Sequence, residues 1–143
     1  MSQTQAGAVA GGPRLVLRAE AALLLVVLLV AYGRLETQFG GPSWWVFAAL
    51  LLVPDLSMLG YLAGPRLGAA AYNAAHTALG PILVGAFGLW AELPFVTGLG
   101  LIWGAHVCLD RALGYGLKYE TAFGDTHLGR LGAGKGRDRR ISP

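Results

Sequence analysis

Charged residues are almost absent from the middle of this chain, and this feature limits its fold more than any other. Between Thr37 and Leu109 only Asp55, Arg66 and Glu92 carry charge, and charged residues make up 13% of the 143-residue sequence. Soluble domains are about one quarter charged, and a small one has a large surface to keep in water. The pattern therefore indicates an integral membrane protein. It excludes a soluble enzyme, a nucleic-acid-binding module and a disordered tail protein.

Four apolar runs are long enough to cross a bilayer, which takes about 20 helical residues. They cover residues 15–32, 44–62, 67–90 and 94–115, and Gly- and Pro-containing breaks separate them. We therefore predict an all-α fold, a four-helix transmembrane bundle with short loops. Residues 14–129 would form a single membrane domain, after a disordered lead over 1–13 and before a basic tail over 130–143.

The basic residues predict how the bundle is oriented. They flank the first span, the turn around Arg66 and the end of the fourth span, whereas the other two loops hold few. By the positive-inside rule both termini lie in the cytoplasm, as in a multi-pass protein of the bacterial cytoplasmic (inner) membrane. The first run has some features of a signal peptide, but Glu20 interrupts it and no cleavage site follows. We therefore expect an uncleaved anchor.

The polar residues of the spans share one depth. Measured from the cytoplasmic end of each span at about 1.5 Å per residue, they form a band roughly 8–14 Å deep. The outer half of every predicted span has no ionisable group. Ionisable groups inside hydrocarbon are costly and usually have a role. The band consists of Glu20, Asp55, Asn73, His76, His106 and Asp110.

Helical spacing predicts that these groups converge. In the third span, helical spacing puts Asn73, His76 and Gly80 on one face of small and polar residues, and His106 and Asp110 are an i,i+4 pair in the fourth. Pro54 removes the hydrogen bond to the carbonyl of Leu50, just before Asp55.

Imidazole and carboxylate together suit Zn²⁺, Fe²⁺ or Mn²⁺, and the single cysteine, Cys108, excludes a multi-thiolate site. We predict His76, His106 and Asp110 as metal ligands. Asp55 would be a fourth ligand or the general base, and Asn73 would join it in the catalytic set. Accessory roles are assigned to Tyr72, which would orient the ligands, and to Glu20, Arg111 and His127.

Each of these residues also has a structural interpretation. His76 could be a hydrogen-bonded histidine of the bundle, Asp110 could pair with Arg111 at the interface, and Glu20 could pair with Arg18. His127 would be a surface residue. Gly100 and Gly104, like Gly60, Gly64 and Gly68, would allow close packing within the chain or between subunits.

Three segments carry a family resemblance: PDLSMLGYLAG at 54–64, GAAAYNAAHT at 68–77, and WGAHVCLDRALGYGLKY at 103–119 followed by DTHLG. Together they resemble an uncharacterised bacterial membrane-protein family, catalogued as domain of unknown function 4260, over about residues 14–132. The resemblance implies a small multi-span membrane protein of unassigned activity. A fainter similarity to membrane-bound metal-dependent hydrolases is an analogy, because their N-terminal histidine motif is missing.

Three functions fit this pattern. The first is metal-dependent hydrolysis or modification of a lipid or lipidated substrate at a site open to the cytoplasm. The second is a structural or partner-binding membrane protein without chemistry. The third is a small proton-coupled transporter acting as a homodimer, with Glu20 or Asp55 exchanging protons. The expected partners are the bilayer lipids and a second copy of the chain, and nucleic acid is not among them.

Overall fold

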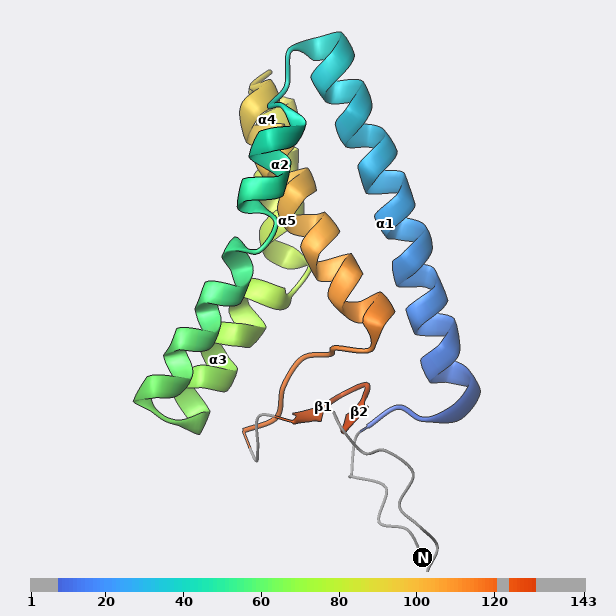
Figure 1. Ribbon diagram of the computed structural model, residues 1–143, viewed down its shortest axis with the longest axis vertical. Coiled ribbons are helices and arrows are strands. Elements are labelled where there is room, and N and C mark those ends of the chain that lie inside the picture. The colour runs from blue at the N-terminus through green and yellow to red at the C-terminus, as the bar shows by residue number, and fades with distance from the viewer. Residues whose placement is uncertain (1–7, 121–123, 131–143) are drawn as a thin grey trace, which may run out of the picture.

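The protein is a bundle of helices with one very short hairpin. The computed structural model describes residues 8–120 and 124–130 (Figure 1). Most of the predicted lead, and all but the first residue of the predicted tail, lie outside these ranges. The helical elements are α1 (Gly11–Phe39), α2 (Trp44–Leu50), the 3₁₀ helix η1 (Val53–Ala63), α3 (Pro65–His76), α4 (Leu79–Trp90) and α5 (Pro94–Leu113). Strands β1 (Asp125–Thr126) and β2 (Gly129–Arg130) pair antiparallel. The predicted helical fold is confirmed, with this two-residue hairpin as an addition.

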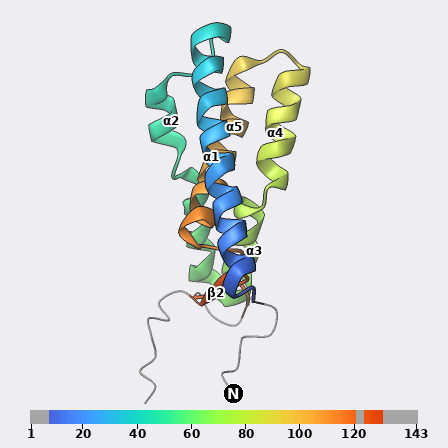
Figure 2. The same cartoon turned by 90° about the vertical axis from the view of Figure 1, so that its right-hand side faces the viewer.

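Helix α5 lies at the centre of the arrangement. It packs along α1 and α4, while η1 packs on α3 (Figures 1 and 2). In Figure 1, α1 and the η1–α3 pair move apart toward the lower end, where the hairpin lies. The start of α1 is at this same end, because Val9 donates its backbone N–H to the carbonyl of His127 at 2.8 Å. The α1–α2 and α4–α5 turns lie together at the opposite end.

Two prolines divide two of the predicted spans. Pro54 lacks an N–H and crowds the carbonyl four residues before it, and α2 ends at that residue, Leu50. The chain continues as η1, an 11-residue 3₁₀ helix, which is unusually long for this conformation. Pro81 likewise lacks an N–H and crowds the carbonyl of Thr77, the residue directly after the end of α3. One continuous helix over residues 67–90 is therefore wrong: the third run is two helices, α3 and α4.

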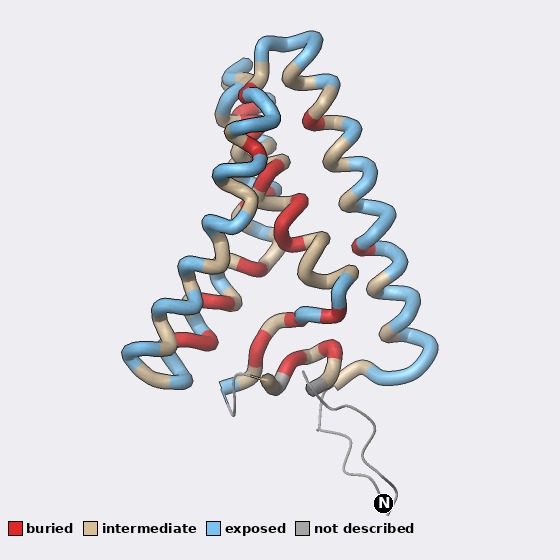
Figure 3. Tube along the Cα trace, viewed as in Figure 1, coloured by how far each residue is buried: buried red, intermediate tan, exposed pale blue. Residues whose placement is uncertain are grey.

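Many of the buried residues lie on α5 (Figure 3), and the helices carry many exposed apolar side chains. Tyr32, Phe47, Ile102 and Ala105 form the core cluster. Two helical stretches, Gly11–Phe39 and Trp44–Ala63, are long and apolar enough to cross a membrane. Only 11% and 6% of their most apolar windows are buried inside the protein. Their apolar side chains are thus mostly on the outside, unlike those of a helix in the core of a soluble protein.

Candidate metal centre

Four side chains from three elements meet at one point of the bundle. Asp55 comes from η1, His76 is the last residue of α3, and His106 and Asp110 lie one turn apart on α5. One ligand atom from each of the four lies within 4.8 Å of the other three. Both imidazoles are buried, at 4% and 1% exposure for His76 and His106. The convergence expected from the shared depth is therefore present in the structure.

The distances between ligand atoms match those around a single small cation. The two Nε2 atoms of His76 and His106 are 3.1 Å apart. Asp55 Oδ1 lies 3.4 Å from His76 Nε2 and 3.5 Å from His106 Nε2. Asp110 Oδ2 lies 3.5 and 3.9 Å from the same two nitrogens. In a regular tetrahedron with bonds of about 2.0–2.1 Å, neighbouring ligands are about 3.3–3.4 Å apart. The five distances scatter around that value.

Tyr72 supports both kinds of ligand. Its hydroxyl donates to Asp110 Oδ2 at 3.1 Å. Its ring stacks on the His76 imidazole, with centroids 3.7 Å apart and planes 10° from parallel. Its backbone carbonyl lies 2.8 Å from His76 Nδ1. A carbonyl only accepts, so His76 Nδ1 carries the proton and neutral His76 presents a lone pair at Nε2. Such an outer contact normally fixes a metal-binding histidine. The predicted orienting role of Tyr72 fits this geometry.

His106 is held in a different way. Among the described residues, its Nδ1 is buried and has no hydrogen-bond partner. Its Nε2 points at the Nε2 of His76 and at the two carboxylates. Without a cation, the His106 Nε2 proton would be donated to His76 Nε2; with one, both nitrogens would present lone pairs. Burial, instead of a second hydrogen bond, orients this ring.

Asn73 lies beside the four residues, but its side chain has another contact. Its Nδ2 donates to the carbonyl of Lys118 at 2.8 Å, and its Oδ1 accepts from the backbone N–H of Lys118 at 2.7 Å. Asn73 thus fastens the segment after α5 to α3. This contact gives Asn73 a positioning role and leaves its predicted place in the catalytic set without support from the geometry.

Lys118 is the residue near the site that the sequence did not indicate. Its side chain is buried at 5% exposure, and its Nζ lies 4.7 Å above the centre of the Tyr72 ring. Burial lowers the pKa of Lys118 from its usual range, while the negative charge of Asp110 acts in the opposite direction. Nothing in the spacing predicts this contact, because it depends on the path of the chain after α5 ends.

The remaining predicted residues lie apart from this centre. Glu20, Arg111 and His127 line a separate small cavity of about 130 Å³ between α1, α5 and the hairpin. Glu20 is exposed on α1. His127 Nδ1 accepts from the backbone N–H of Leu117 at 2.8 Å, which places it in the hairpin contact. The His/Asp centre therefore consists of four of the nine residues assigned from the sequence, with Tyr72 next to it.

Comparison with known proteins adds the family but no activity. No curated protein and no solved structure matches the chain. The model of one family, described as a domain of unknown function (DUF4260), matches residues 14–131. This match confirms the resemblance seen in the three sequence segments and covers the described bundle from Arg14 onward. The chain belongs to that uncharacterised DUF4260 family.

Proposed function

We propose that this protein is a multi-pass membrane protein that binds one divalent metal ion at the centre formed by Asp55, His76, His106 and Asp110, with His76, His106 and Asp110 as its ligands. The observation that carries the proposal is the set of distances of 3.1–3.9 Å between the two imidazole nitrogens and the two carboxylate oxygens. Two imidazoles and two carboxylates favour Zn²⁺, Fe²⁺ or Mn²⁺. Four such groups inside an apolar bundle lower its stability unless they pair with one another or with an ion.

The membrane assignment has its own support. The exposed apolar faces of α1 and of α2–η1 would be covered by lipid tails. The α3–α4 and α5 segments complete four passes, in the bacterial inner membrane expected from the sequence. Basic residues cluster at the end where α1 starts, so this end faces the cytoplasm under the positive-inside rule. Both termini then lie on the cytoplasmic side, and the metal centre lies in the cytoplasmic half.

The chemistry that fits best is hydrolysis of a lipid or a lipidated substrate. A bound divalent ion polarises an ester or phosphoryl oxygen and makes water acidic near neutral pH. His76, His106 and Asp110 would hold the ion. Asp55 is the best placed to accept a proton, because its side chain is more exposed than that of Asp110, 33% against 19%, and Tyr72 holds Asp110. Catalytic zinc sites keep three protein ligands and one open position.

Metal analysis of untagged protein, purified in detergent without chelators, tests this function. We expect about one Zn, Fe or Mn per chain. His76→Ala and His106→Ala should each lower that content at least tenfold while the protein stays monodisperse. His127→Ala is the matched control, because His127 lies outside the centre, and it should keep the metal. Asp55→Asn should retain most of the metal and lose hydrolysis.

A non-enzymatic role is the second candidate, and the 3.1 Å contact between the two imidazoles favours it directly, since that is also a hydrogen-bond distance. In that case the histidines and carboxylates would be a polar network that fastens η1, α3 and α5 together. If the wild-type protein holds no metal, even after incubation with stoichiometric Zn²⁺, the metal proposal fails and the network remains.

A further inference from the structure

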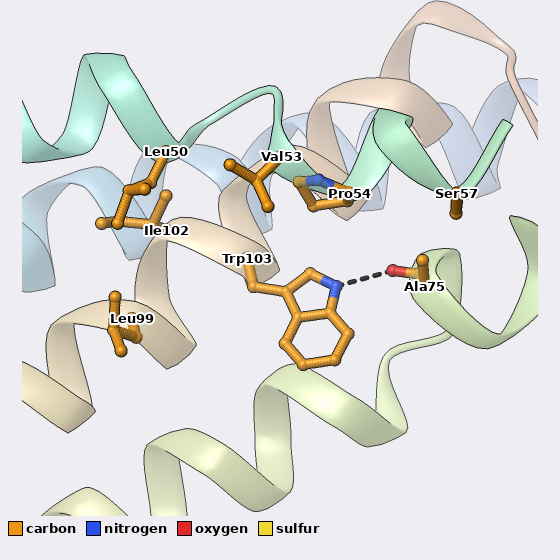
Figure 4. A pocket seen from close by; sticks show the side chains of 8 residues that line it. All are labelled: Leu50, Val53, Pro54, Ser57, Ala75, Leu99, Ile102 and Trp103. Carbon is orange, nitrogen blue, oxygen red and sulfur yellow. Dashed lines mark hydrogen bonds between the residues drawn. The ribbon is translucent and has the colours of Figure 1, made fainter. Parts of the chain in front are cut away.

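An apolar cavity of about 450 Å³ lies next to the metal centre and is built from the same three elements together with the end of α2 (Figure 4). Pro54 immediately precedes Asp55, Ala75 immediately precedes His76, and Trp103 lies one turn before His106. Leu50 and Leu99 line its other end, and Val53, Ser57 and Ile102 complete the lining. A volume of this size is typical of pockets that hold a small organic ligand.

The residues that line the cavity extend along α5, away from the cytoplasmic end of the bundle. Leu99 lies seven residues before His106 on α5, which places it about 10 Å further from the cytoplasmic end. One end of the cavity is therefore at Pro54 and Ala75, the chain neighbours of Asp55 and His76, and the other points toward the middle of the bilayer. In a lipid of the cytoplasmic leaflet, the polar group and the acyl chain are arranged in the same order. The cavity matches such a lipid in both polarity and orientation.

One buried polar atom lies at the end near the metal centre. Ser57 Oγ is buried and has no hydrogen-bond partner among the described residues. In Figure 4 Ser57 lies at the same end as Ala75, whose carbonyl accepts from Trp103 Nε1 at 2.6 Å. A buried hydroxyl without a partner is destabilising. An ester oxygen of a lipid would supply that partner, whereas a plain hydrocarbon would not.

The mouth of the cavity opens where lipid can reach it. Val53 lines the cavity and is 47% exposed, and Leu52 and Leu56 beside it on the chain are 63% and 62% exposed. These side chains lie on the outer apolar surface of α2–η1. Another cavity, about 620 Å³, is lined by Arg34 and Glu92 at the opposite end of the bundle, away from the metal centre.

We infer that this cavity binds one acyl chain of an ester-linked membrane lipid, with an ester oxygen accepting a hydrogen bond from the Ser57 hydroxyl. The inference rests on the proposed function and names its substrate class. The chain enters sideways from the bilayer past Val53, and the reacting group then lies beside the metal ligands.

Fluorescence quenching of Trp103 tests the inference. The variant Trp44→Phe/Trp45→Phe/Trp90→Phe leaves Trp103 as the only tryptophan. In dodecyl maltoside micelles it is titrated with phosphatidylcholine that carries dibrominated stearoyl chains. We expect quenching that saturates near one lipid per chain. Adding Leu99→Phe, which fills the cavity, should weaken the binding at least fivefold. Leu83→Phe, on an exposed face of α4, is the matched control and should leave it unchanged.

Ser57→Ala provides a second variant in case Leu99→Phe disturbs folding, and it should weaken lipid binding several-fold. Quenching that never saturates, or that is equal in the Leu99→Phe and Leu83→Phe variants, would overturn the inference. Metal content is measured on the same samples. If the protein holds metal but shows no saturable quenching, the lipid inference fails and the metal proposal stands. If it shows saturable quenching but holds no metal, the metal proposal fails and the lipid inference stands.

Discussion

Tyr72 contacts the candidate metal centre in three ways: through its hydroxyl, its ring and its backbone carbonyl. Replacing it with phenylalanine removes only the hydrogen bond to Asp110 and keeps the stacking on His76. Loss of an outer-shell partner typically lowers metal affinity 10–100-fold. We therefore expect Tyr72→Phe to bind zinc at the same stoichiometry but about tenfold more weakly, as measured by competition with a chromophoric chelator.

Tyr32 offers the matched control for this substitution. Its hydroxyl donates to the carbonyl of Ser43 at 3.0 Å, near the opposite end of the bundle. Tyr32→Phe removes a hydrogen bond of the same kind, so it should lower stability without changing zinc affinity. Equal zinc affinities in the Tyr72→Phe variant and the wild type would show that Asp110 needs no support from Tyr72.

At the scale of elements, Gly100 lies at a point where α4 and α5 approach each other closely. A Cβ atom added at Gly100 would lie 2.5 Å from the backbone N and Cα of Gly85. A Cβ added at Gly104 would meet the flexible side chain of Leu28 at 3.3 Å. The sequence predicts a packing strip that includes both glycines. The structure places the backbone contact at Gly100, and it is a contact within the chain.

This difference predicts unequal effects of the same substitution. Gly100→Ala should destabilise the protein by about 1–3 kcal/mol, because neither helix backbone can move aside without strain. Gly104→Ala should be neutral or stabilise by up to about 1 kcal/mol, since alanine favours the helix and Leu28 can shift. Thermal unfolding of both variants in detergent gives the comparison. A larger loss for Gly104→Ala would contradict the backbone contact between α4 and α5.

The hairpin contact should respond to pH. Burial and, to a lesser degree, the charge of Arg111 lower the pKa of His127 from its usual value of 6.5. The unfolded segment then binds a proton more readily than the folded one. The contact is fully stable above about pH 6.5 and weakens as pH falls from there toward the lower folded pKa. Protonation at Nδ1 also removes the acceptor for the Leu117 N–H.

Hydrogen exchange of the Leu117 amide measures this effect. We expect its protection, corrected for the intrinsic exchange rate, to fall between pH 6.5 and 5. The variant His127→Gln cannot titrate, so its protection should be independent of pH in that range. Protection of the wild type that is constant from pH 7 to 5 would show that His127 stays neutral throughout.

Two prolines set boundaries between the helical elements, but the sequence predicts a break only at Pro54 and not at Pro81. Pro54 predicts a break, and α2 ends at Leu50 as the missing hydrogen bond requires. Pro81 carries the same signal for Thr77, but the regular spacing of small and polar residues across 69–80 suggests one helix. The break frees the carbonyl of Ala75, which Trp103 then caps. That long-range contact has no local signature.

The His/Asp centre is easier to predict than its surroundings. Antiparallel spans bring residues at equal depth together, so depth alone points to Asp55, His76, His106 and Asp110. The same reasoning places Glu20 and Asn73 in the band, and depth cannot tell which face of a helix points inward. The structure shows Glu20 exposed and Asn73 bonded to Lys118. Rotation about the helix axis is set by packing, which the sequence encodes only indirectly.

At the scale of the whole molecule, the proposed topology makes a simple prediction. Reporter fusions placed after Pro143 and within residues 35–41 should report opposite sides of the membrane, with the first in the cytoplasm. The reason is that the start of α1 and the hairpin lie at one end, and the α1–α2 turn lies at the other. A tail reporter that is active outside the cytoplasm would invert the topology and place the metal centre in the outer half.

The residues of the proposed metal centre come from three separate segments, and this has a consequence for how the protein is made. In the proposed topology, Asp55 and His76 enter the bilayer before His106 and Asp110, which come later in the chain. Until α5 inserts, the nascent chain carries a buried carboxylate and an imidazole without their partners. Under this proposal the ligand set is complete only after the last span is in place, so metal loading would be a late, post-insertion step.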